Sequence, residues 1–111
     1  MTRISNIFDF PEIKGDEEIV EALTDGETKI ERIISTGQVT PEGEWYDQSL
    51  DEWVVLLEGE AKLLFEETGE VYLKPGDYIL IKAHERHRVI YTSTLPPCLW
   101  LAVHGKHTTT K

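Results

Sequence analysis

The side chains best suited to chemistry lie between residues 52 and 87. Glu52 begins an apolar run, and His84 and His87 follow three residues apart. Carboxylates and imidazoles can transfer protons, and both bind divalent transition metals. Each of the three also has an ordinary structural interpretation: Glu52 as a solvated strand end, His84 as an exposed turn residue, and His87 as a core histidine that bonds a backbone carbonyl.

Further candidates lie in the loop that precedes Glu52. This loop carries Trp45, Tyr46, Asp47 and Gln48 in succession. The two aromatic residues suit a core or an interface as well as the wall of a pocket. Asp47 can instead bond backbone amides of its own loop. The loop is therefore a candidate part of a binding site, with a structural alternative for each residue.

Alternation along the later strands indicates which residues point the same way. His87, Val89 and Tyr91 share one parity, so a barrel that buries His87 also directs Tyr91 inward. His104 shares the parity of Trp100 on the last apolar run. His104 therefore lines either the same cavity or its rim.

The acidic composition limits the classes of partner. The chain of 111 residues has 21 Asp and Glu against 11 Lys and Arg, a formal net charge of −10. Proteins that bind nucleic acid neutralise phosphates with clustered Lys and Arg, and the only basic run here is Arg86-His87-Arg88. We therefore expect neither nucleic acid nor an anionic membrane as a partner.

The same composition indicates the compartment. Cys98 is the only cysteine, so an intrachain disulfide cannot form. Apolar stretches such as Trp53 to Leu57 are too short to cross a bilayer. The first residues are not followed by the apolar run of a signal peptide. We expect a cytoplasmic protein.

Turn residues at short intervals indicate an all-β protein. Glu58-Gly59 predicts a tight hairpin, and Lys74-Pro75-Gly76-Asp77 has proline and glycine where a type II turn needs them. The expected strands cover residues 30–34, 52–58, 60–66, 71–73, 78–81, 87–92 and 99–104. Many short strands with little helix are typical of a β-sandwich or β-barrel.

The N-terminal part is expected to differ from the rest. Asp16 predicts the N-cap of a short helix that continues to Leu23 and ends at Gly26. We therefore divide the chain into three parts. These are an N-terminal extension with a short helix (1–28), a β-barrel (29–105) and a polar tail (106–111).

The strand expected at residues 52–58 is apolar on both faces. Val54 and Leu56 share one face, and Trp53 and Val55 share the other. A strand with one wet face alternates between apolar and polar residues, so this one is buried on both sides. One face would line the barrel, and a second sheet, the N-terminal segment or a second subunit would cover the other.

Two segments resemble the sequence motifs of the cupins. Glu52, six residues and Gly59 are similar to the end of the first motif. Residues 75–87 are similar to the second motif, with Lys82 and His84 in place of the usual Pro and Gly. Because both occur in the cupin order and spacing, the chain resembles small single-domain bacterial cupins. The resemblance implies a cupin-type β-barrel, that is, a double-stranded β-helix or jelly roll. Because cupins commonly dimerise, it also implies a homodimer.

The resemblance also implies a divalent transition metal (Fe, Mn, Ni or Zn) at the mouth of the barrel. In typical cupins the ligands are a His-x-His, the Glu of the first motif and the His of the second. Glu52 and His87 match the last two. No His-x-His precedes Glu52, so this motif is degenerate; Asp47 or Gln48 falls at its place, and His84 is an additional imidazole. These five residues are the candidate metal ligands.

Two functions follow from the resemblance, and the residues leave both open. One is a metal-dependent cupin that acts on a small polar molecule by an unspecified reaction. The other is a non-catalytic cupin that has lost its metal and binds a sugar or an organic acid. In either case the candidate ligand-binding residues are Trp45, Tyr46, Tyr91 and His104. No catalytic residue can be assigned from the sequence, and it does not decide whether the protein is an enzyme.

Overall fold

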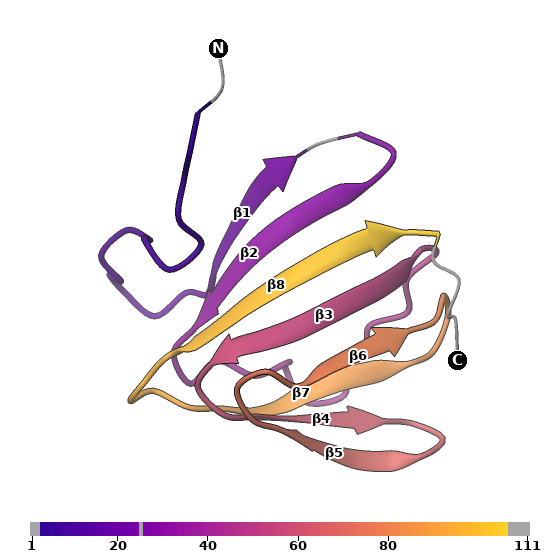
Figure 1. Cartoon of the computed structure of the whole chain (residues 1–111). Helices are drawn as coiled ribbons and strands as arrows, with labels where there is room; N and C mark the ends of the chain where they lie inside the picture. The colour runs from indigo at the N-terminus through magenta and orange to yellow at the C-terminus, as the bar shows by residue number, and fades with distance from the viewer. Residues whose placement is uncertain (1–2, 25, 107–111) are drawn as a thin grey trace.

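The chain folds into two antiparallel sheets (Figure 1). The computed structural model describes residues 3–24 and 26–106. Its strands are β1 (Ile19–Thr24), β2 (Lys29–Ser35), β3 (Asp51–Glu58), β4 (Ala61–Phe65), β5 (Gly69–Leu73), β6 (Tyr78–Ile81), β7 (His87–Thr92) and β8 (Cys98–Gly105). Five form a sheet in the order β1-β2-β8-β3-β6, and three form a sheet in the order β5-β4-β7. The all-β, double-stranded β-helix fold is confirmed; most of the expected polar tail, residues 107–111, lies outside the described residues.

The helix expected between Asp16 and Leu23 does not form. Residues 19–24 are strand β1, which pairs antiparallel with β2 and places Ile19 opposite Ile34. Helical preference over so short a segment is weak, and pairing at the sheet edge satisfies the same backbone groups. Residues 3–24 and 26–106 contain no helix, so this prediction was wrong.

The turn predicted at Glu58-Gly59 forms, but it does not close a hairpin. β3 pairs with β6 and β8, whereas β4 pairs with β5 and β7, so the turn carries the chain from one sheet to the other. Gly59 has φ 87°, and a Cβ there would lie 2.8 Å from the Cys98 Cα. Both the backbone conformation and the close approach therefore require glycine.

The hydrophobic core lies between the two sheets. Leu56, Ala61 and Ala102 are fully buried in it, and Phe65 and Leu73 are nearly so. Inward residues alternate along each strand, as in other sheets packed face to face. Part of this core also forms the wall of a cavity, described below.

The outer face of the five-stranded sheet is partly covered by the segment before β1. Arg32 on β2 donates hydrogen bonds to the backbone carbonyls of Ile7 (3.3 Å) and Asp9 (2.9 Å). It also bonds the carboxylate of Glu21 on β1 at 2.9 Å. Over β2, the N-terminal segment is therefore the cover that the apolar outer face needs. Within residues 3–24 and 26–106, no helix is long and apolar enough to cross a membrane.

Candidate functional site

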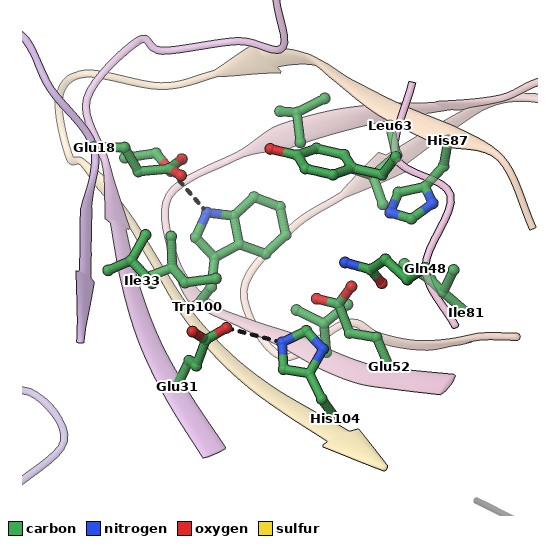
Figure 2. Close-up of a pocket in the computed structure, with 15 residues that line it drawn as sticks. Glu18, Glu31, Ile33, Gln48, Glu52, Leu63, Ile81, His87, Trp100 and His104 are labelled. Atoms are coloured by element: carbon green, nitrogen blue, oxygen red, sulfur yellow. Dashed lines mark hydrogen bonds and ion pairs between the residues drawn. The ribbon is translucent and has the colours of Figure 1, made fainter. Parts of the chain in front are cut away.

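A cavity of about 230 Å³ opens between the sheets. Figure 2 shows side chains from several strands pointing into it. Its apolar walls come from Ile33, Val54, Leu63, Ile81, Val89 and Trp100. Its charged or titratable lining residues include Glu18, Glu31, Glu52, His87 and His104. Because side chains alternate along a strand, the residues that line the cavity from any one of β2, β3, β7 and β8 share one parity.

His87, the first residue of β7, lies in the wall with one nitrogen already bound. Its Nδ1–H donates to the backbone carbonyl of Glu85 at 2.9 Å. The imidazole is 4% exposed and stacks against Tyr46 and Phe65, with ring centroids 5.4 and 5.6 Å away. The carbonyl bond leaves Nε2 as the nitrogen available for chemistry. The core-histidine interpretation and a functional role are thus compatible.

Glu52, on β3, lies in the same cavity and is 8% exposed. Burial raises the pKa of its carboxyl group, while His104 and His87 oppose that shift. Gln48 also lines the cavity and donates a hydrogen bond to Glu52. The Oε1 atom of Gln48 is buried and has no hydrogen-bond partner among the described residues. The site therefore contains an unused acceptor next to a carboxyl group that holds its proton more tightly than usual.

His104, on β8, forms a pair with Glu31 on β2. Its Nε2–H donates to Glu31 Oε1 at 2.9 Å, and both side chains are largely buried. Lys29 lies 3.1 Å from the other oxygen of Glu31. Figure 2 shows the His104 ring between Glu31 and Glu52. The structure thus places His104 in the cavity wall, and Glu31 sets the orientation of its ring.

A chain of hydrogen bonds leads from Trp100 through Ser35 to Glu18, which also lines the cavity. The Trp100 indole N–H donates to Ser35 Oγ at 3.2 Å, and the Ser35 hydroxyl donates to Glu18 at 2.7 Å. Neither Glu18 nor Glu31 was a candidate from the sequence. The sequence did contain a signal for Glu31. Glu31, Ile33 and Ser35 alternate along β2, so they point to the same side of the strand. Glu18 had none, since the expected helix assigned it to a first turn.

Two of the five candidate metal ligands lie outside the cavity and bond one another. His84 Nδ1–H donates to Asp47 Oδ1 at 2.7 Å, and both side chains are substantially exposed. The cavity contains the other three, Glu52, His87 and Gln48. Residues 3–24 and 26–106 contain no group of three or more His, Cys, Asp or Glu that could hold a metal ion. The metal-ligand roles therefore stay predictions, and the arrangement does not fit the four-ligand set that the resemblance implies.

The aromatic candidates divide in the same way. Tyr46 lines the cavity, and burial, followed by the charge of Glu18, raises the pKa of its phenol. Trp45 lies instead beside the guanidinium groups of Arg86 and Arg88, at 5.5 and 5.8 Å from the ring centroid.

Tyr91 lies outside the cavity and is 43% exposed. A bulge in β7 explains this position. Val89 lies opposite Leu63, but Tyr91 lies opposite Lys62, so one extra residue interrupts the alternation. Tyr91 therefore points away from the side to which His87 and Val89 point.

Residues 32–104 match the family model described as a cupin domain. The L-ectoine synthase of Mycolicibacterium vanbaalenii is 40% identical over 63 residues, which is 50% of this chain. The chain spans about half the length of that curated relative (47%).

Solved structures extend the comparison to the whole chain. A Ralstonia eutropha protein with the provisional name mannose-6-phosphate isomerase is 40% identical, with a TM-score of 0.88 over 96% of this chain and 100% of that one. A cupin superfamily protein of Desulfitobacterium hafniense is 18% identical, with a TM-score of 0.73 over 87% of this chain and 84% of that one.

Proposed function

This chain belongs to the cupin domain family, and from that premise we propose that its cavity binds one small polar molecule and transfers a proton to or from it. The single observation that supports this function is the convergence of Glu52 and His87 in one cavity. They come from β3 and β7, which belong to different sheets. A molecule bound between them meets a titratable group on each side.

The two groups are suited to complementary roles. The pKa of Glu52 is raised toward neutral pH, and a carboxyl group with such a pKa can both give and accept a proton. His87 exchanges a proton through Nε2, because Nδ1 is held by the Glu85 carbonyl. One group can remove a proton from the bound molecule while the other returns one to a neighbouring atom, which is an isomerisation. The provisional isomerase name of the Ralstonia relative agrees with this class of reaction.

Hydrogen–deuterium exchange tests the proposal without knowledge of the product. The protein is incubated in D₂O with mixtures of sugars, amines and organic acids, and loss of carbon-bound hydrogen is followed by NMR. Glu52→Gln and His87→Gln should each slow exchange by about a hundredfold or more, the usual contribution of a general acid or base. The matched control is Glu70→Gln, at an exposed position of β5, which should leave the rate unchanged. Exchange that persists in both cavity variants would rule out these roles.

A metal-dependent reaction is the second candidate. It is favoured by the three cavity groups Glu52, His87 and Gln48, of which the Gln48 Oε1 has no hydrogen-bond partner among the described residues. One carboxylate, one imidazole and one amide form a weak set for Fe, Mn, Ni or Zn, so we derive no step through a metal. Metal analysis of untagged protein, before and after reconstitution, separates the two candidates. A stoichiometric metal that Glu52→Gln and His87→Gln remove would favour the metal-dependent one.

A further inference from the structure

The charges that line the cavity are mostly negative. Three carboxylates, from Glu18, Glu31 and Glu52, face two imidazoles, from His87 and His104. No Lys or Arg of the described residues lines the cavity. With neutral imidazoles the lining is negative whether or not Glu52 holds its proton, because Glu18 and Glu31 remain. Lys29 offsets part of the charge of Glu31 but does not line the cavity. The cavity therefore attracts cations and repels anions, and the net charge of −10 on the chain acts in the same direction.

We propose that the natural ligand of this cavity is a small organic ammonium compound, and that phosphorylated or carboxylated molecules are excluded. The proposal rests on the proposed function only in requiring that this cavity is the binding site. It adds the chemical class of the molecule that binds there.

The hydrogen-bonding groups of the cavity independently favour a ligand that donates hydrogen bonds. The buried Oε1 of Gln48 is an acceptor without a partner among the described residues. Glu18 uses one oxygen for the Ser35 hydroxyl, and Glu31 uses its two oxygens for His104 and Lys29. Because a carboxylate has about four acceptor positions, both keep some available, and Glu18 keeps more. An ammonium group carries two or three N–H donors, whereas phosphate and carboxylate groups carry mainly acceptors.

Trp100 supplies an aromatic surface between the two outer carboxylates. Figure 2 shows its indole extending between Glu18 and Glu31. The negative face of an indole attracts ammonium groups, most strongly where water is excluded, and Trp100 is only 5% exposed. An aromatic face flanked by carboxylates is a suitable recognition site for an ammonium group.

The size of the cavity limits the ligand. A volume of about 230 Å³ equals roughly seven or eight water molecules of liquid volume. This is below the usual range for drug-sized ligands. A linear amine or an amino sugar fits such a space.

The carboxylates of the cavity disfavour the kind of substrate that the name of the Ralstonia relative implies. A sugar phosphate brings a charge of about −1.5 to −2 at neutral pH, which proteins bind with Arg, Lys or helix N-termini. The described residues place none of these in the cavity wall. We therefore do not extend the phosphorylated substrate implied by that name to this chain.

Two matched series of probes test the inference. The first is 1,4-diaminobutane, 1,4-butanediol and succinate, and the second is glucosamine, glucose and glucuronate. Each series changes the charge from positive through neutral to negative on a nearly constant frame. Binding is measured by NMR titration and by thermal shift at fixed pH and ionic strength. We expect the ammonium member of at least one series to bind at least about tenfold more tightly than its neutral partner, and the anions not to bind.

The variant Glu18→Gln should weaken ammonium binding by about tenfold, which corresponds to about 1.4 kcal/mol. It removes a charge but keeps an oxygen that can accept the Ser35 hydroxyl. Glu70→Gln, an equal change of charge at an exposed position of β5, should have no effect. Stronger binding of a neutral or anionic member, or no binding of either ammonium probe, would overturn the inference. If an anion bound and Glu52→Gln abolished its deuterium exchange, the inference would fail while the proposed function survived.

Discussion

At the scale of one residue, the burial of Glu52 in the cavity lowers the stability of the folded protein when this carboxyl group is ionised. A carboxyl group that is 8% exposed loses most of its hydration, which raises its pKa in spite of two nearby imidazoles. The folded state therefore binds this proton more tightly than the unfolded state does. Ionising Glu52 in the native protein destabilises it, as is common for groups that serve function rather than stability.

The resulting pH dependence has a definite sign. Below the unfolded-state pKa, Glu52 is protonated in both states and carries no penalty. As the pH rises through the folded-state pKa, the unfolded state loses its proton first, so the free energy of unfolding falls. We expect Glu52→Gln to raise the melting temperature at pH 7 but not at pH 4. Melting curves across this range check the prediction, and a variant that is less stable than the wild type at pH 7 would contradict it.

At the scale of elements, short turns that cross between the sheets determine where the site residues lie. The turn at Gly59 takes the chain directly from β3, which carries Glu52, to β4 of the other sheet. The turn at Lys74–Asp77 does the same between β5 and β6. Because each turn is tight, strands of opposite sheets stay in fixed register across the cavity.

Gly59→Ala tests the importance of this crossing. The added Cβ would lie 2.8 Å from Cys98 Cα and Pro97 O, on a residue with φ 87°. Strain at a positive φ alone costs about 1 to 3 kcal/mol, so the total loss should be larger. The matched control is Gly69→Ala, at φ 95°, where nothing lies within 4 Å of the added Cβ. Chemical denaturation should show a larger loss for Gly59→Ala, and equal losses would refute the role of the close contact.

At the scale of the whole molecule, the apolar outer face of the five-stranded sheet is only partly covered. The N-terminal segment reaches β2 through Arg32, but on β3 and β6 the rings of Trp53 and Tyr78 lie 5.5 Å apart, and Tyr78 is 62% exposed. Exposed apolar patches of this kind are typical of surfaces that contact another molecule. This face is where we would expect the partner in the predicted homodimer.

Light scattering at micromolar concentration tests the homodimer and should give twice the monomer mass. Tyr78→Lys should shift the protein toward monomer, because a charge at the centre of an interface must lose its hydration. Tyr91→Lys provides the control, since Tyr91 is similarly exposed but lies on the other sheet. A monomeric wild type, or equal effects of the two variants, would count against this interface.

The resemblance to the cupins led to the prediction that Glu52 and His87 share one site. The sequence by itself determined the all-β class and most of the strands. It did so because alternation and turn residues are local properties that survive without knowledge of the partner strand. The tertiary structure decided the rest. Pairing with β2 made residues 19–24 a strand, and the bulge in β7 turned Tyr91 outward.

The same limit applies to the partners of the site residues. The Asp47–His84 bond and the Glu31–His104 pair join residues 37 and 73 positions apart in the chain. No local pattern encodes such a contact, because it depends on how segments far apart in the chain come together in the fold. For this reason the set of carboxylates that line the cavity, on which the proposed class of ligand rests, became apparent only in the folded chain.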